Sequence, residues 1–239
     1  MWSLVQLYFR RAGFRTLVLY LSALFLAATF ITSIILSGLW RDNKLSSILP
    51  AQFNKTSPAI QASMVFYYFE TLFMRAGIIL LEGFLSYQII ARAFEDRTIA
   101  QLLTYPISRT KVYLGMLFAI FLISGLVLLI LHLLVIIIFY LMLKNFRLLN
   151  LDTFLFKDLV LDPGFILAGL LSGVVAMFKN KVGYIIGNAI FLCVILGNAT
   201  VSTYKNQNNN YLFWALLIIA LMTLSGSFLA LKKFNHLNI

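Results

Sequence analysis

The chain has 239 residues, of which 62% are hydrophobic and only 11% are charged. A soluble domain carries about a quarter charged residues, so this composition excludes an ordinary soluble protein and indicates an integral membrane protein. The net charge of +11 does not indicate nucleic-acid binding, because the basic residues lie mostly at the ends of apolar stretches and form no continuous stripe.

The first element in chain order is an amphipathic segment, residues 1–16. It carries Trp2, Tyr8, Phe9 and Phe14 among basic residues. This composition favours a helix that lies on the membrane surface, so we expect an N-terminal interfacial helix. The apolar run that follows is too long for the core of a signal peptide and lacks a clear cleavage pattern. We therefore interpret that run as a retained first span.

Long apolar stretches define the rest of the chain. A helix needs about 20 apolar residues to cross hydrocarbon about 30 Å thick. Unpaired backbone groups are strongly unfavourable in lipid, so such stretches are helices rather than exposed strands or loops. We expect an all-α integral membrane protein, with a single transmembrane domain over residues 1–239. Six stretches qualify, approximately Leu17–Leu39, Val65–Ala91, Val112–Leu143, Phe165–Phe178, Val182–Thr203 and Leu212–Leu231.

The distribution of basic residues predicts the orientation of these spans. Lys and Arg are more frequent on the side of the membrane that would hold both termini. Because cytoplasmic loops are enriched in Lys and Arg, we expect a multi-pass protein of the cell membrane with both termini in the cytoplasm. Residues 144–163 then form an outer loop against the membrane surface, with Asp162 outside. The fourth span could begin as early as Leu159.

Several ionisable residues fall within or beside the spans. Glu70, Arg75 and Glu82 belong to the region of the second span, and His132 lies deep in the third. Intramembrane charges usually face a protein interior or a water-filled cavity. We therefore consider Glu82, Arg75 and His132 candidates for a substrate path or a subunit interface. Alternatively, residues 63–75 form an outer interfacial helix that leaves Glu70 and Arg75 in water.

Spacing limits how these groups can interact. Arg75 and Glu82 share a helix face but lie two turns, about 10 Å, apart, so they cannot pair directly. His132 could relay protons, but a hydrogen-bonded core histidine fits as well, and no second histidine offers metal-ligand spacing. Cys193 is the only cysteine, so no disulfide can form within one chain, and we expect a small core residue there.

Small residues recur at four-residue spacing on consecutive spans. Gly169 and Gly173 form one pair, and Gly183 and Gly187 form another. Such pairs let helix backbones approach closely in membranes. We expect spans four and five to pack together as a hairpin.

The polar segment between the second and third spans predicts a short helix outside the membrane. Ile99, Leu102 and Leu103 have the i, i+3, i+4 spacing of an apolar helix stripe. Glu95 and Asp96 stand at its start, where the helix dipole favours anions.

A break follows this short helix. Pro106 cannot continue it, and Ser108 stands where the next helix needs an N-cap. The run Leu102-Leu103-Thr104-Tyr105-Pro106-Ile107-Ser108-Arg109 resembles the first cytoplasmic loop of permease subunits of type-2 ABC exporters. Two positions depart from that pattern: Arg97 replaces a usual glycine before Thr98, and Met116 follows Gly115 where lysine is usual.

The resemblance implies a coupling helix that binds a cytoplasmic ABC ATPase. It further implies a second permease subunit, identical or related, within a lipid bilayer. ATP and Mg would be bound by the ATPase, and this chain would hold no cofactor or metal. The ATPase-coupling residues implied are the apolar anchors Ile99, Leu102 and Leu103 and the polar contacts Glu95, Asp96, Arg97 and Arg109.

No catalytic motif accompanies these features. The chain has no phosphate-binding loop, and neither a nucleophile elbow nor a His-Glu-x-x-His motif. We therefore expect no enzyme activity from this chain alone. The main expectation is the membrane subunit of an ATP-driven exporter. The alternatives are a non-transporting membrane anchor of a larger complex, a permease similar to the haem exporter of cytochrome c maturation, and an intramembrane enzyme that uses Glu82 and His132.

Overall fold

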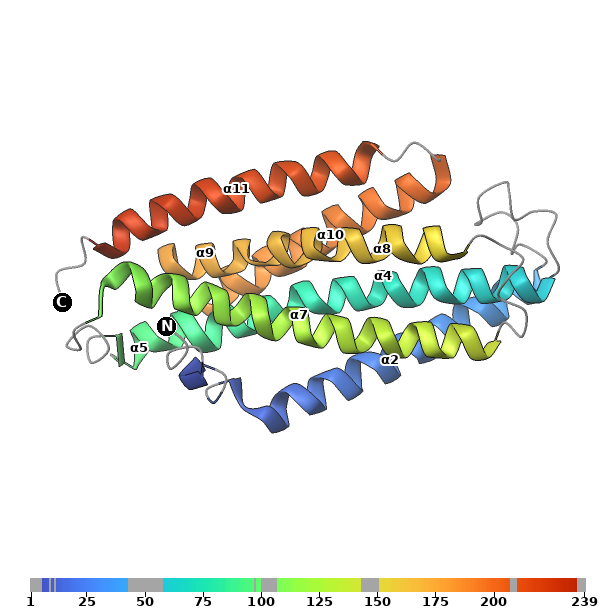
Figure 1. Ribbon diagram of the computed structural model, residues 1–239, viewed down its shortest axis with the longest axis horizontal. Helices are drawn as coiled ribbons and strands as arrows, with labels where there is room; N and C mark the ends of the chain where they lie inside the picture. The colour runs from blue at the N-terminus through green and yellow to red at the C-terminus, as the bar shows by residue number, and fades with distance from the viewer. Residues whose placement is uncertain are drawn as a thin grey trace.

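The computed structural model describes residues 6–8, 10, 12–42, 58–96, 98–99, 107–142, 151–206 and 210–235. All regular secondary structure in these ranges is helical (Figure 1). In chain order the elements are α2 (Phe14–Arg41), α4 (Pro58–Ser86), the π-helical turn η2 (Tyr87–Ala91), α5 (Arg92–Glu95), α7 (Arg109–Met142), α8 (Leu151–Gly169), α9 (Leu171–Phe178), α10 (Val182–Asn206) and α11 (Asn210–Asn235).

The described residues contain six helical stretches that are long and apolar enough to cross a membrane, which confirms the predicted number of spans. The chain is therefore a multi-pass membrane protein. The second stretch joins α4, η2 and α5, and the fourth joins α8 and α9. The six are Arg15–Leu39, Met64–Glu95, Arg109–Ile138, Val160–Phe178, Val182–Val201 and Tyr211–Asn235.

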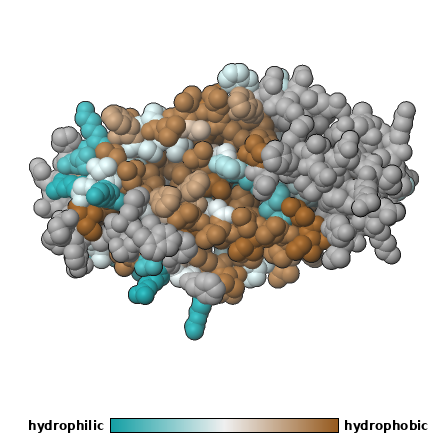
Figure 2. All heavy atoms as spheres, in the orientation of Figure 1, coloured by the Kyte–Doolittle hydropathy of each residue, from teal (hydrophilic) through white to brown (hydrophobic). Residues whose placement is uncertain are grey.

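Helix α4 is the centre of the bundle. It packs against α2, α7, α8 and α10. In the apolar stretch that defines each span, 72% of the residues of the second span are buried, compared with 11% for the first and 22% each for the fifth and sixth. The long helices run side by side, and both termini lie at the end of the bundle that holds α5 (Figure 1). Hydrophobic side chains cover the middle of the face shown in Figure 2, as expected for a surface in contact with lipid.

The N-terminal segment is helical at residues 6–8, 10 and 12. Tyr8 and Ala12 are buried in the main hydrophobic core. Gly13 has a φ of 74°, which a residue with a side chain rarely adopts. This glycine therefore separates the N-terminal helical segment from α2 and allows the chain to change direction.

The fourth span begins at Val160, close to Leu159, the earlier start that the sequence allowed. The predicted outer loop at 144–163 is helical from Leu151, where α8 begins. Pro163 lies inside that helix, although proline usually interrupts helices by removing a hydrogen-bond donor. Asp162 is only 5% exposed, so it lies in the protein interior and not in an exposed loop.

The glycine pairs behave differently from each other. The expected contact between spans four and five forms, since α9 packs against α10 and Asn188 Nδ2 donates to Ser172 Oγ at 3.1 Å. However, an added side-chain carbon at Gly183 or Gly187 would meet nothing within 4 Å. The close-packing role expected of those two glycines is therefore not seen within this chain.

Gly169 and Gly173 instead allow α4 and α7 to approach. A side-chain carbon at Gly169 would overlap the Glu82 carboxyl group. At Gly173 it would lie 2.9 Å from Leu117 Cδ2 and 3.4 Å from Ser86 Oγ. Both glycines thus make room for side chains of the second and third spans rather than for the backbone of the fifth.

This geometry predicts opposite outcomes for matched alanine substitutions. Gly169→Ala forces a methyl group against Glu82 and should lower the free energy of unfolding by about 1–3 kcal/mol, the usual cost of overpacking. Gly187→Ala adds a methyl group in open space and should be neutral or stabilising, by up to about 1 kcal/mol, because alanine favours helix. Thermal unfolding of the purified variants in detergent measures both changes. Equal effects would contradict the assigned packing.

The fold also predicts which loops share a side of the membrane. Asp42 follows α2, and the exposed Lys181 lies in the turn between α9 and α10. Single cysteines at these two positions, in a Cys193→Ser background, should react with a membrane-impermeant maleimide from opposite sides of sealed vesicles. With both termini cytoplasmic, the cysteine at 181 should be accessible only from the cytoplasmic side. Labelling of both positions from one side would contradict the six-span arrangement.

Candidate functional site

Three buried polar side chains from three spans meet inside the bundle. Arg75 of α4 contacts Asp162 of α8: its Nε donates to Oδ1 at 3.0 Å, and an Nη atom lies 2.9 Å from the same oxygen. His132 Nδ1 of α7 lies 3.2 Å from Asp162 Oδ2. The guanidinium also lies 4.9 Å from the centre of the Phe165 ring. We call Arg75, His132 and Asp162 the buried triad.

The buried triad solves an electrostatic problem. All three side chains are nearly inaccessible. For the side chain alone, the exposed fraction is 2% for Arg75, 6% for His132 and 7% for Asp162. A buried charge is tolerated when it is paired and hydrogen-bonded. Arg75 and Asp162 offset each other, and His132 Nδ1 lies within hydrogen-bond distance of the second carboxylate oxygen. The arrangement joins the second, third and fourth spans.

Sequence reasoning found two members of the triad and missed the third. Arg75 and His132 were predicted as intramembrane polar residues, but Asp162 was assigned to an outer loop. The alternative in which residues 63–75 leave Glu70 and Arg75 in water is wrong, because both are buried. A signal for Asp162 did exist: a cation in a span needs a nearby anion, and Asp162 directly precedes an apolar run.

Glu70 connects the first two spans. Its Oε1 accepts a hydrogen bond from Thr29 Oγ1 and its Oε2 accepts one from Thr32 Oγ1, each at 3.1 Å. The two threonines lie three residues apart on α2 and so share one face of that helix. Glu70 is fully buried and therefore fixes how α2 lies against α4.

Glu82 is the most isolated of the buried carboxyl groups. It is 0% exposed, it lies against the Gly169 backbone, and the Ser124 hydroxyl of α7 is beside it. Neither carboxyl oxygen has a hydrogen-bond partner of good geometry among the described residues. The seven-residue separation from Arg75 prevents direct pairing, as the spacing predicted. Glu82 thus lies at the contact of three helices, within the chain's own interior.

No metal centre is built from these groups. Among the described residues, no three His, Cys, Asp or Glu side chains lie close enough together to hold an ion. Cys193 is partly buried and its Sγ donates to Ala76 O at 3.3 Å. That contact gives Cys193 a place in the packing of α10 against α4.

The end of the bundle that holds α5 carries the segment that joins the second and third spans. We call this segment, α5 together with residues 96–108, the connector. Helix α4 passes through the π-helical turn η2 into α5. The connector's polar residues are solvent-exposed: Arg92 Nε lies 3.3 Å from Asp96 Oδ2, and the Tyr87 hydroxyl donates to Glu95 Oε2 at 3.2 Å. These contacts hold Glu95 and Asp96 at the protein surface.

Only part of the predicted coupling helix is described by the structure. Thr98 and Ile99 are helical, and Ile99 is 3% exposed within the main core. The anchor role expected for Ile99 therefore does not fit this conformation, because its side chain packs against the chain itself. Arg97, Leu102 and Leu103 lie outside the described residues.

An aromatic cluster attaches the connector to two further spans. Phe94 of α5 and Tyr113 of α7 both contact Phe234 of α11, with ring centres 6.3 Å and 6.0 Å from it. Arg109 Nη1 donates to the backbone oxygen of Asn235 at 3.1 Å. We call Phe94, Tyr113 and Phe234 the aromatic cluster. Sequence spacing could not predict this cluster, because its members are far apart in the chain.

The buried triad generates a prediction about stability. Asp162→Asn leaves the Arg75 charge buried without its anion, and should lower the free energy of unfolding by about 3–5 kcal/mol. The matched control Asp96→Asn removes an exposed pair with Arg92 and should change stability by less than about 1 kcal/mol. Unfolding in detergent, followed by thermal shift, gives both values.

A double substitution separates charge from packing in the same experiment. Arg75→Leu with Asp162→Leu removes both charges and should recover most of the stability lost in Asp162→Asn, because apolar replacement of a buried pair is often nearly neutral. If the double variant is less stable than Asp162→Asn, the triad contributes through more than charge compensation.

Comparison with known proteins adds no relative to this description. No protein-family model, curated protein or solved structure matches the chain.

Proposed function

We propose that this chain is the membrane-spanning subunit of an ATP-driven ABC exporter, and that a separate cytoplasmic subunit hydrolyses ATP. The sequence resemblance around residues 95–115 supports the family. The observation that carries the mechanism is the connector's attachment to three spans. A connector fixed to α4, α7 and α11 through the aromatic cluster would move those helices together when pushed.

The local backbone fits such a mechanical role. The η2 turn replaces ordinary helix between α4 and the connector, and π-helical turns of this kind occur frequently at functional sites. The turn places a change in helix geometry where a force from outside the membrane would enter α4. ATP-driven movement of the partner would then tilt the spans and switch access across the membrane.

Different residues of the connector would contact the bundle and the ATPase. Ile99 packs inward and would hold the connector to the bundle. Leu102 and Leu103 complete the predicted apolar stripe and are proposed to insert into the ATPase. Glu95 and Asp96 are at the surface, where they would make polar contacts around that insertion, together with Arg97.

The position of a second permease subunit follows from which helices are least buried. Helices α2, α10 and α11 present large apolar surfaces. A second subunit would pack on part of this surface and lipid would cover the remainder. The buried triad and Glu82 are closed off inside the chain in this conformation. We therefore assign them to the packing of the spans, and a substrate path through them would require these helices to separate.

The connector generates the central functional prediction. Each of Leu102 and Leu103, buried in an ATPase groove, would contribute about 1.5–3 kcal/mol. Leu102→Asp would instead place a charge in an apolar site, which is strongly unfavourable. We expect a folded, membrane-inserted subunit that no longer retains the ATPase when the two are co-expressed and purified in mild detergent. ATPase binding and transport that survive Leu102→Asp combined with Leu103→Asp would exclude this segment as the coupling element.

Two control variants distinguish docking from transmission. On the predicted helix, position 101 is nearly opposite the centre of the apolar stripe. Gln101→Asp should therefore retain ATPase binding. Phe234→Ala removes the aromatic contact with Phe94 at the far end of the chain, and should retain ATPase binding while lowering transport per ATP hydrolysed. Loss of binding in Phe234→Ala would show that the aromatic cluster shapes the docking surface itself.

A further inference from the structure

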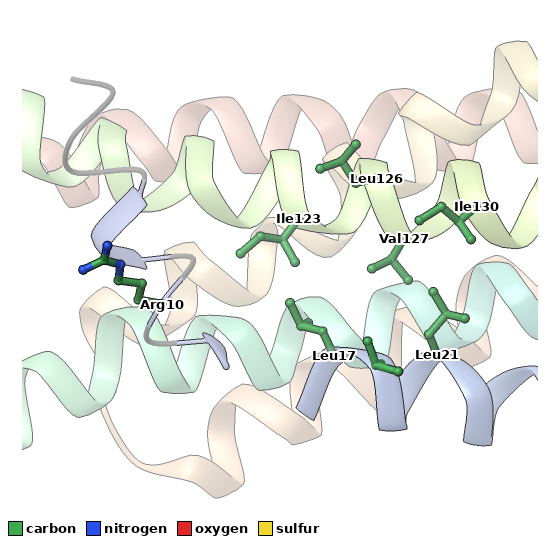
Figure 3. A pocket seen from close by; sticks show the side chains of 8 residues that line it. Arg10, Leu17, Leu21, Ile123, Leu126, Val127 and Ile130 are labelled. Carbon is green, nitrogen blue, oxygen red and sulfur yellow. The ribbon is translucent and has the colours of Figure 1, made fainter. Parts of the chain in front are cut away.

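A groove opens between the start of α2 and the middle of α7. Its volume is about 580 Å³. Figure 3 shows apolar side chains from both helices facing it and Arg10 at one end. The lining residues are Arg10 with Leu17, Val18 and Leu21 of α2, and Ile123, Leu126, Val127 and Ile130 of α7.

The groove exists because α2 is attached to the bundle through α4. Tyr20 donates to Gly77 O at 2.6 Å, and Thr29 and Thr32 donate to Glu70. All of these hydrogen bonds are accepted by residues of α4. The first turns of α2 therefore stand apart from α7.

The walls of the groove are fixed, and its mouth is open to the membrane. Ile123 and Val127 are 1% and 6% exposed and form its floor. Val18, Leu126 and Ile130 are 47%, 53% and 45% exposed and form its rim. An apolar surface of this shape inside a bilayer accepts an apolar ligand such as a lipid tail.

The charged end of the groove is also held in place. Arg10 is exposed, but Tyr8 and Ala12 on either side of it are buried in the main core. No acidic side chain pairs with Arg10 in the part of the chain that the structure describes. A guanidinium group binds phosphate through paired hydrogen bonds, so this end is complementary to a phosphate headgroup.

The charge at one end of the groove favours a lipid over a helix from a second copy of the chain. Helices α2, α10 and α11, which present the large apolar surfaces, contain no Asp or Glu. None of them therefore offers an anion to Arg10, whereas a phospholipid supplies both an apolar chain and a phosphate.

We propose that the groove between α2 and α7 binds an acyl chain of an anionic phospholipid from the surrounding membrane, with the lipid phosphate held by Arg10. This site is independent of the proposed transport function, because neither the connector nor an ATPase takes part in it.

Photo-crosslinking tests the proposal on the full chain reconstituted in vesicles. The probes are phosphatidylglycerol and phosphatidylcholine that carry the same diazirine-labelled acyl chain, each at trace level in unlabelled phosphatidylcholine. Peptide mapping should place crosslinks on residues 123–130 several-fold more often with the phosphatidylglycerol probe. Equal crosslinking by the two probes would overturn the headgroup assignment, since ordinary contact with bulk lipid has no such preference.

Three variants complete the design. Arg10→Gln should reduce the phosphatidylglycerol signal to that of phosphatidylcholine, whereas the matched control Arg15→Gln, outside the groove lining, should leave the preference unchanged. Val127→Trp should fill the groove and lower crosslinking by both probes, provided that the variant remains monodisperse. Loss of the preference in both arginine variants would indicate general basic attraction and overturn the proposal. Crosslinks that decrease as the protein-to-lipid ratio rises would show that a second copy of the chain covers the groove, and would also overturn it.

Discussion

The ion pair between Arg75 and Asp162 is the constraint on which the arrangement of the spans depends. A cation inside the apolar bundle needs an anion nearby, and Asp162 of α8 supplies one to Arg75. That requirement keeps Asp162 within the protein interior and makes the surrounding residues helical rather than a surface loop. His132 contacts the second oxygen of the same carboxylate, so the third span is positioned by the same group.

The other buried carboxyl groups also have polar neighbours, but these neighbours are uncharged. Glu70 is satisfied by two threonine hydroxyls of α2, and Glu82 lies against a glycine backbone and a serine hydroxyl. All of these residues except the threonines and Asp162 belong to α4 or α7. The central helix α4 therefore carries most of the polar contacts, and its neighbours are oriented by the groups it offers them. Helices α2, α10 and α11 are left with wide apolar surfaces for lipid or other protein.

The connector shows how a surface segment can be mechanically linked to distant parts of the chain. Phe94 lies near the end of the second span and Phe234 near the end of the last described helix, and their rings are in contact. Ile99 adds an inward-facing anchor. These attachments support the proposed role in transmitting force.

The sequence by itself determined the class of protein, the six spans and their approximate limits, because the length and apolar character required to cross lipid are local properties. It also marked Glu82, Arg75 and His132 as candidates for burial, but it left open whether Arg75 lies in water. Only the tertiary structure decided the partners. Asp162 was assigned to an outer loop because it lies between the third and fourth apolar stretches, and its pairing with Arg75 joins residues 87 positions apart. The glycine pairs looked equivalent along the chain, but only Gly169 and Gly173 face crowded neighbours. Spacing records which face a residue occupies, whereas what lies opposite that face depends on how separate helices pack.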